Sequence, residues 1–317
     1  MTNRQTEKQG QIVKGLSGFY YIEDQDSRKI YQTRARGLFR KEQLTPLVGD
    51  YVSFQADNPH EGVLTAVKER KNELDRPPVA NIDLAFVVAS VTQPQIPSKL
   101  IDRMLVYSES QRIQPALYFS KLDLFDEAER EELQPLLANY QSLGYQVLTN
   151  LDLSQADEDL LTELFHGKTI AAMGQSGVGK TTLLNHLLPD LHKETAAISK
   201  GMGRGKHTTR HVELHDVYGG KLVDTPGFSS LSLDSIEKED LGDYFPEMRE
   251  RSDSCKFREC SHTHEPHCAI KAALAAGEIS QSRYDHYVEF LQEIINKKPD
   301  YQQKNRRKKK WKLPQVF

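Results

Sequence analysis

A phosphate-binding loop constrains this chain more than any other feature. Residues 174–181 read Gly-Gln-Ser-Gly-Val-Gly-Lys-Thr and satisfy every position of the pattern G-x-x-x-x-G-K-[ST]. Its glycines lack a Cβ, so successive backbone N–H groups can turn inward around phosphate oxygens. Lys180 supplies a cation for the β- and γ-phosphates, and the Thr181 hydroxyl is placed to bind Mg²⁺. Because residues 169–173 read as a buried strand and 182–188 as a helix, the motif predicts an α/β nucleotide-binding domain.

A second nucleotide-responsive element is expected at residues 220–227, Gly-Lys-Leu-Val-Asp-Thr-Pro-Gly. A short strand runs into Asp224, and the following Pro and Gly mark a turn. An Asp at the end of a strand beside a phosphate loop can reach Mg²⁺, usually through water. The Gly227 N–H can contact a γ-phosphate and release it on hydrolysis. Residues 224–227, Asp-Thr-Pro-Gly, could form an ordinary turn, but their position after a phosphate loop favours a switch.

The candidate base reader lies upstream of the phosphate loop. Residues 114–119 read as a strand and end in Ser120-Lys121-Leu122-Asp123, close to the N-K-x-D pattern that reads guanine in GTPases. Asp123 would accept hydrogen bonds from guanine, and the Lys121 stem would lie along the base. Ser120 stands where Asn is usual, which predicts weaker nucleotide binding but the same choice of base. By itself this tetrapeptide could equally be an ordinary helix start. The next strand, 145–149, is expected to bring a backbone contact to the base near Thr149 and Asn150.

These motifs run in the order base reader, phosphate loop, switches, which is a circular permutation of the ordinary GTPase order. The site depends on loops at the carboxyl ends of strands in one mostly parallel sheet with flanking helices, so spatial adjacency suffices. Domain termini are often close enough to be rejoined elsewhere. The residues expected to bind GTP or GDP are Ser120, Lys121, Leu122, Asp123, Gly174, Gln175, Ser176, Gly177, Val178, Gly179, Lys180, Thr181, Thr182, Asp224 and Gly227.

With these motifs in view, the chain resembles the bacterial ribosome small-subunit-dependent GTPase A family (RsgA, also called YjeQ or YloQ). Further stretches carry the resemblance: 203–213 (a first-switch signature), a Cys/His cluster at 255–268, Arg-Gly-Leu-Phe-Arg at 36–40 and Pro-Leu-Val-Gly-Asp at 46–50. The resemblance implies a GTP hydrolase that binds the small ribosomal subunit and its rRNA, assists late maturation and is stimulated by the subunit. We expect the protein to be a cytoplasmic monomer.

The first-switch stretch is glycine-rich and basic. Residues 199–210 hold three glycines, few apolar side chains and five cationic ones, counting His207 when protonated, so the stretch is expected to order only around an anion. Either Thr208 or Thr209 can close on Mg²⁺ when the γ-phosphate is present. The alternative is a basic surface loop that contacts RNA.

The group that orients the attacking water is missing from its usual place. Many GTPases carry Gln directly after the D-x-x-G glycine, whereas this chain has Phe228, which cannot hydrogen-bond to water. His207 is the candidate replacement, because an imidazole can orient or accept from water near neutral pH. The alternative is that His207 contacts RNA or solvent only.

The cysteines indicate a structural zinc site. All three fall within fourteen residues, as Cys255-x₄-Cys260-x-His262-x₅-Cys268, which offers three thiolates and one imidazole for tetrahedral Zn²⁺. A disulfide would leave one thiol over, and we expect no signal peptide. Four protein ligands close the site, so its role should be structural. His264 and His267 compete with His262, and the family resemblance favours His262. Residues 270–295 read as helical, broken at Gly277.

The N-terminal residues predict a small β-barrel of the OB type. Five short strands fit within about sixty residues, with β-rich alternation and glycine turns. Aromatic and cationic side chains interleave, as on surfaces that bind single-stranded nucleic acid, although half of the aromatic rings could instead be core. The resemblance favours RNA binding. The side chains concerned are Tyr20, Tyr31, Phe39, Arg34, Arg36 and Arg40.

The composition is that of an ordinary globular protein and is consistent with a multidomain α/β fold. The chain is 38% hydrophobic and 27% charged, with no apolar run long enough to cross a membrane. Its net charge of −3 hides a basic stretch at 297–312, with nine cations against Asp300, which is expected to be disordered and to suit phosphate backbones. We expect an OB-fold RNA-binding domain (1–72), a circularly permuted GTPase domain (73–235), a helical zinc-binding domain (236–297) and a basic tail (298–317).

Two rival functions come from other classes of protein. One is a nucleotide-dependent RNA-binding scaffold with little intrinsic catalysis, suggested by Phe228 and Ser120. The other is a metabolic P-loop kinase, which is disfavoured because no acceptor-substrate motif accompanies the switches. Phosphate release, compared with phosphate transfer to an acceptor, separates the hydrolase from the kinase.

Overall fold

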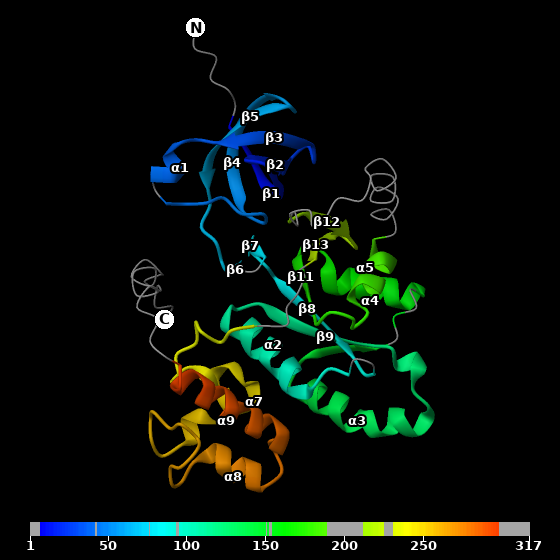
Figure 1. The fold of residues 1–317 in the computed structure, drawn as a ribbon, viewed down its shortest axis with the longest axis vertical. Coiled ribbons are helices and arrows are strands. Elements are labelled where there is room, and N and C mark those ends of the chain that lie inside the picture. The colour runs from blue at the N-terminus through cyan, green and yellow to red at the C-terminus, as the bar shows by residue number, and fades with distance from the viewer. Residues whose placement is uncertain are drawn as a thin grey trace. The chain divides into compact units, whose positions relative to one another are not determined.

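The computed structural model describes residues 7–41, 43–75, 77–92, 95–149, 151, 154–188, 212–224 and 231–297. The chain divides into two compact units, residues 1–231 and 232–317. Figure 1 shows the first unit as a barrel of strands joined to a layered α/β domain, and the second as a helical group. Within the described residues, no helix is both long and apolar enough to cross a membrane.

The first unit begins with a closed five-stranded barrel, as predicted. Its strand order is β1-β2-β3-β5-β4, with a parallel β3–β5 pair among antiparallel neighbours. Alternating apolar residues such as Ile12, Ile22 and Phe54 are fully buried inside it. The elements are β1 (Lys8–Leu16), β2 (Phe19–Asp24), β3 (Ile30–Ala35), α1 (Leu38–Lys41), β4 (Tyr51–Asn58) and β5 (Glu61–Val67).

The barrel uses part of its aromatic series for its own core. Tyr31 and Phe39 are buried, so their rings are not available for stacking on bases, and Tyr20 is half-buried. Burial of the Tyr31 and Phe39 rings removes apolar surface from water and so stabilises the barrel. On the outer surface the Arg34 guanidinium instead lies over the Phe19 ring, 4.5 Å from its centroid. Arg36 is exposed, and the side chain of Arg40 lies outside the described part of the chain.

The α/β domain is built on a six-stranded sheet in the order β10-β9-β8-β11-β13-β12. All of its pairs are parallel except β12–β13. The central strands β8 and β11 are buried along their whole length, which explains their continuous apolar runs. The strands are β8 (Leu84–Ser90), β9 (Gln114–Ser120), β10 (Gln146–Thr149), β11 (Thr169–Met173), β12 (Leu214–Val217) and β13 (Gly220–Asp224).

Helices cover both faces of this sheet. In Figure 1, α2 and α3 lie on one side of the sheet and α4 and α5 on the other. Asp126 and Ser154 cap α3 and α4 through their side chains, which explains where these helices begin. The helix predicted at 182–188 begins two residues earlier, at Lys180, directly after the left-handed Gly179. The helices are α2 (Ser98–Ser110), α3 (Glu127–Ser142), α4 (Gln155–Phe165) and α5 (Lys180–Leu187).

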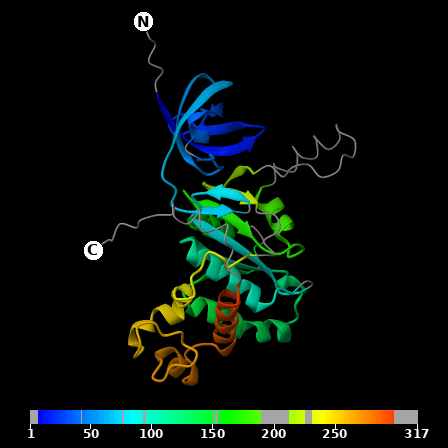
Figure 2. The same ribbon diagram turned by 60° about the vertical axis from the view of Figure 1, so that its left-hand side comes forward.

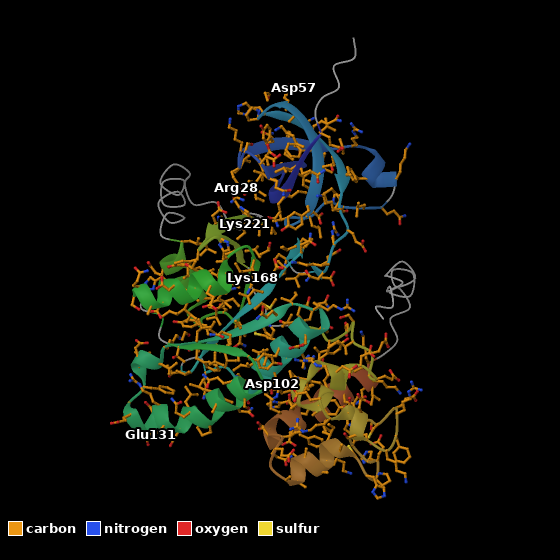
Figure 3. All side chains as sticks on the ribbon, turned by 180° about the vertical axis from the view of Figure 1, so that it is seen from behind. Arg28, Asp57, Asp102, Glu131, Lys168 and Lys221 are labelled. Carbon is orange, nitrogen blue, oxygen red and sulfur yellow. The ribbon has the colours of Figure 1, made fainter. Side chains whose placement is uncertain are left out.

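Barrel and sheet meet along one seam within the first unit. Strand β1 of the barrel forms an antiparallel bridge to the residue before β12, Lys14 to Glu213, and the two side chains pair at 2.7 Å. Lys221 of β13 pairs with Glu23 of the barrel and, at 2.7 Å, with Asp216 of β12. A cavity of about 290 Å³ lies beside these pairs, with Arg28, Lys168 and Lys221 in its lining (Figure 3).

The seam also contains a short hairpin, β6 (Glu73–Asp75) and β7 (Pro78–Ala80), that connects barrel to sheet. Val48 of the barrel bridges Val79 of this hairpin. Nearby, the buried Asn81 side chain donates to the Gly49 carbonyl at 3.0 Å. Figure 2 shows the hairpin strands in cyan between the barrel and the α/β domain.

The second unit is a small helical group around one aromatic core. Phe245, Tyr287 and Phe290 pack together, with Phe245 and Tyr287 edge to face at 5.5 Å. The buried Arg283 guanidinium donates two hydrogen bonds to the Glu247 carboxylate, at 2.7 and 2.9 Å. The predicted break at Gly277 is present, with φ +75° between α8 and α9. The elements are η2 (Leu241–Tyr244), α7 (Pro246–Arg249), η3 (Ser252–Ser254), α8 (Ala269–Ala275) and α9 (Gln281–Ile295).

Candidate functional site

The phosphate loop joins β11 to α5, as its sequence requires. Gly177 and Gly179 have φ +84° and +89°, a region that residues with a Cβ rarely occupy. A Cβ at Gly174 would lie 2.7 Å from the Val88 carbonyl oxygen, so only glycine fits between this loop and β8. Lys180 is largely buried at the first turn of α5, whereas Thr181 and Thr182 are exposed there. The helix N-terminus and the loop therefore open in one place, where an anion is favoured.

The candidate base-reading turn, residues 120–123, lies against this loop. Register pairs Ser90 with Ser120, so β8 and β9 end together beside the end of β11. The Ser120 hydroxyl donates to the Val178 carbonyl at 2.6 Å, and the Lys121 ammonium donates to the Gly177 carbonyl at 3.1 Å. The sequence placed these two motifs at one sheet edge but did not predict the bonds. A hydroxyl at the end of a buried strand was the available signal for the first bond.

Asp123 is exposed just beyond this junction, in the short helix η1 (Leu122–Leu124). Lys121, which precedes η1, adopts the left-handed conformation with φ 67° and so turns the chain sharply after β9. A carboxylate is thereby presented to solvent next to the phosphate loop. On the neighbouring strand β10, the half-buried Thr149 ends the strand where a contact to the base was predicted.

Tyr118 links strand β9 to the loop that follows β10. It lies two residues before Ser120 on β9, and a backbone hydrogen bond links it to Leu151, just after β10. Burial raises the pKa of Tyr118, the hydrogen bond to Leu151 opposes this, and the nearby Asp123 carboxylate adds to it. Tyr118 and Ser120 therefore fasten the loops on either side of β9.

The switch residues are only partly covered by the described chain. Asp224 ends β13, paired in register with Ala172 of β11, so its backbone lies beside the start of the phosphate loop. The Asp224 side chain lies outside the described part. Asn150, His207, Thr208, Thr209, Gly227 and Phe228 lie outside the described residues. Their roles remain predictions.

A second site gathers the predicted zinc ligands in the helical unit. One ligand atom each from Cys255, Cys260, His262 and Cys268 lies within 4.8 Å of all the others. The His262 Nδ1 atom is 3.7 Å from the Cys255 sulfur and 3.5 Å from the Cys268 sulfur, and those two sulfurs are 3.9 Å apart. A tetrahedral Zn²⁺ would space sulfur pairs by about 3.8 Å and sulfur–nitrogen pairs by about 3.6 Å. The donor set fits zinc in both chemistry and spacing.

Neighbouring groups hold these ligands in place. The Ala269 N–H donates to the Cys255 sulfur at 3.3 Å, and the Tyr284 hydroxyl donates to the His262 carbonyl at 2.7 Å. Burial would raise the pKa of Glu265, but hydrogen bonds from the Ser261 backbone and its neighbours outweigh burial and hold that pKa at about 2. The competing imidazoles His264 and His267 are both exposed and do not belong to the four-ligand group.

Both the barrel and the nucleotide-binding domain match models of one protein family. The model described as RsgA GTPase matches residues 67–234, more than half of the chain, and the RsgA N-terminal domain model matches residues 9–64. The chain belongs to the RsgA family. The motifs quoted above therefore predicted the family correctly, across both the barrel and the nucleotide-binding domain.

Whole-chain relatives extend this result. A Bacillus subtilis (strain 168) protein named small ribosomal subunit biogenesis GTPase RsgA is 50% identical over 299 residues, covering 92% of this chain and 99% of that protein. A Streptococcus pyogenes serotype M6 protein of the same name is 49% identical over 300 residues, covering 95% and 100%. This RsgA-family chain thus spans nearly the whole length of these relatives.

Solved structures agree with the permuted order of motifs. A structure described as YloQ, a circularly permuted GTPase, has a TM-score of 0.80 at 45% identity and covers 95% of this chain and 99% of its own. YjeQ from Thermotoga maritima has a TM-score of 0.79 at 33% identity, covering 92% and 100%. The predicted fold of this family member, with barrel, permuted nucleotide-binding domain and Cys₃His cluster, is confirmed.

Proposed function

We propose that this RsgA-family chain is a GTP hydrolase that binds the small ribosomal subunit and assists its late maturation. One observation carries the nucleotide part: the bonds from Ser120 and Lys121 to the carbonyls of Val178 and Gly177. They bring a purine reader and a phosphate cradle to one sheet edge, where the two ends of a single nucleotide can be held. The names of the relatives support the ribosomal part.

Each predicted residue then has a role toward GTP. Asp123 accepts hydrogen bonds from guanine, the Lys121 stem covers the base, and the backbone of residues 174–179 surrounds the phosphates. Lys180 neutralises charge on the β- and γ-phosphates. The residues assigned to contact the nucleotide are those named from the sequence: Ser120, Lys121, Leu122, Asp123, Gly174, Gln175, Ser176, Gly177, Val178, Gly179, Lys180, Thr181, Thr182, Asp224 and Gly227.

Mg²⁺ fits the oxygen donors at this edge. Thr181 is exposed on the first turn of α5, beside Lys180, and Asp224 ends the strand next to β11. A hydroxyl, a carboxylate and phosphate oxygens are the ligands that Mg²⁺ prefers. Either Thr208 or Thr209 would complete the set, and His207 would orient the attacking water in place of Phe228. When bound, the ion supplies charge neutralisation between the β- and γ-phosphates.

The remaining parts serve stability and binding. One zinc ion held by Cys255, Cys260, His262 and Cys268 would stabilise the helical unit, because a structural zinc site contributes folding free energy. The barrel (1–72) and the basic tail (298–317) would contact rRNA phosphates, beside a GTPase domain (73–235) and a zinc domain (236–297). We propose that the protein acts as a cytoplasmic monomer.

Turnover with and without purified small subunits tests the proposal. Wild-type protein should release phosphate from GTP slowly alone and faster with subunits, and Lys180→Ala should abolish both rates. Binding of GTP and subunits without any stimulation would favour the nucleotide-dependent scaffold. Transfer of the γ-phosphate to an acceptor would favour a kinase.

A further inference from the structure

The loop between the first two zinc ligands carries an exposed aromatic ring between two cations. Phe257 is 43% exposed, which makes it one of the few large apolar side chains left in solvent among the described residues. Lys256 and Arg258 on either side are also exposed, and the Lys256 ammonium lies 5.7 Å from the Phe257 ring centroid. Lys256, Phe257 and Arg258 are called the metal-loop tip below.

The charges around the tip set it apart from the rest of residues 232–297. Residues 232–297 hold 14 acidic side chains against 8 Lys and Arg, a net charge of −6. Most of those cations pair with neighbours, as Arg283 does with Glu247 and Lys297 does with Asp234. Within residues 231–297, the cations without an ion pair or a side-chain hydrogen bond are Lys256, Arg258 and Lys271. Two of these three flank Phe257.

The tip lies between two of the four predicted metal ligands. Four residues separate Cys255 from Cys260, so a metal ion bound by both would fix the loop at each end. The Lys256 N–H donates to the His267 carbonyl at 3.4 Å, which ties the tip to the segment of the last ligand. A preorganised loop loses little conformational freedom when it binds a partner.

We infer that the metal-loop tip is a docking point for single-stranded RNA, with an unpaired base stacking on Phe257 and Lys256 and Arg258 contacting phosphates. This inference rests on the proposed function, since the RNA would be that of the small subunit. An exposed ring flanked by cations is the usual arrangement for stacking a base next to its phosphates. One apolar side chain cannot form the apolar centre of a protein–protein interface, which argues against a protein partner.

The net negative charge of residues 232–297 limits where RNA can bind on this part of the chain. Residues 232–297 carry net negative charge and repel a polyanion except near cations such as those of the tip, while the basic stretch 298–312 of the same unit adds a separate attraction. Glu259, exposed and next to Arg258, opposes the attraction to the tip. Glu259→Gln should therefore leave RNA binding unchanged or strengthen it.

The test measures binding of the full-length, zinc-loaded protein to purified small subunits in the presence of a non-hydrolysable GTP analogue. Phe257→Ala should raise the Kd about 5-fold or more, the scale of one lost base stack, while Phe257→Trp should retain binding. Ile295→Ala is the matched control, because Ile295 is 51% exposed elsewhere in the same unit. Lys256→Ala and Arg258→Ala should each lower the salt dependence of binding by about one ion.

Zinc content and thermal unfolding of each variant show whether it is folded. If wild-type protein does not bind subunits, the proposed function fails. If wild-type protein binds and Phe257→Ala binds equally well, the docking point is overturned while the proposed function stands. A photoreactive benzophenone analogue of phenylalanine at position 257 decides the partner: crosslinking to rRNA is expected, and crosslinking only to a ribosomal protein would overturn the inference.

Discussion

The Ser120 hydroxyl donates a 2.6 Å hydrogen bond to the Val178 carbonyl, and this bond ties the proposed base-reading turn to the phosphate loop. Ser120 is 5% exposed and Val178 is fully buried, so water is largely excluded from the bond. The substitution of Ser for the usual Asn thus retains a link between the two halves of the nucleotide site. The link predicts that affinity for GTP and for GDP depends on the Ser120 hydroxyl through this bond to the phosphate loop.

Ser120→Ala should raise the Kd for GTP and for GDP by a similar factor, about 5-fold. The reason is the loss of one neutral hydrogen bond, worth about 1 kcal/mol, from a part of the site common to both nucleotides. Isothermal titration with each nucleotide measures the effect. Ser142→Ala is the control, since that exposed hydroxyl donates to the Asn139 carbonyl away from the site. Equal affinities for wild type and Ser120→Ala would show that the bond does not support binding.

Asp123→Asn should shift preference from GTP toward xanthosine triphosphate. The carboxylate that accepts from the guanine ring N–H and amine becomes an amide, which matches xanthine instead. Competition binding with the two nucleotides measures the shift, and neighbouring Asp126→Asn, which alters only the cap of α3, serves as the control. An unchanged GTP preference would remove residues 120–123 as the base reader.

Cys260→Ser should lose zinc and destabilise the helical unit. A structural zinc site contributes folding free energy outright, so removing one of four ligands should lower the free energy of unfolding and expose residues 236–297 to protease. Elemental analysis and limited proteolysis check both effects. Chelation of wild-type protein should reproduce them. Purified wild-type protein without bound metal would contradict the zinc assignment.

His207→Ala should leave GTP binding nearly intact and lower subunit-stimulated hydrolysis about 10²-fold, the usual scale for a positioned acid–base group. Turnover measured against subunit concentration separates this role from RNA contact. If His207 only contacts RNA, the subunit concentration needed for half-saturation should rise while saturated turnover stays normal. Normal saturated turnover would remove His207 from the mechanism.

Glu265 predicts a pH dependence in the stability of the zinc unit. Hydrogen bonds hold its pKa at about 2, below the ordinary value of 4.5, so the charged form stabilises the folded state. That contribution is complete above about pH 5 and falls as the pH drops from there toward 2. The difference in unfolding free energy between wild type and Glu265→Gln should therefore be constant from pH 8 to 5 and shrink below. A constant difference down to pH 3 would contradict it.

Local patterns predicted most of the nucleotide-binding domain. The run 169–173 is β11 as predicted, and Asp123 follows β9 as expected, because buried strands and turn residues carry their signal in adjacent positions. Ligand chemistry and spacing likewise pointed to the three cysteines, whereas the choice of His262 over His264 and His267 came from the family resemblance. These features need little knowledge of distant contacts.

Features that depend on distant contacts were less readable. Tyr31 and Phe39 could be either stacking or core residues in the sequence, and only closure of the barrel turns both rings inward. The bond from Ser120 to Val178 joins residues 58 positions apart, and the hydroxyl at the end of a buried strand signalled a bond without identifying its partner. The uncompensated charge at Lys256 and Arg258 likewise became visible only once most other cations of residues 231–297, such as Arg283 and Lys297, were seen to be paired.

The seam between barrel and sheet has a further consequence for how the chain can be divided. Strand β12 is the last strand of the sheet order, and the residue before it bridges Lys14 of the barrel. A strand at the border of a sheet exposes unpaired backbone groups that can recruit another chain. The barrel therefore shields part of this border, and a fragment cut after the barrel would carry an open template for strand addition. The barrel thus covers part of the sheet border at which another chain could add a strand.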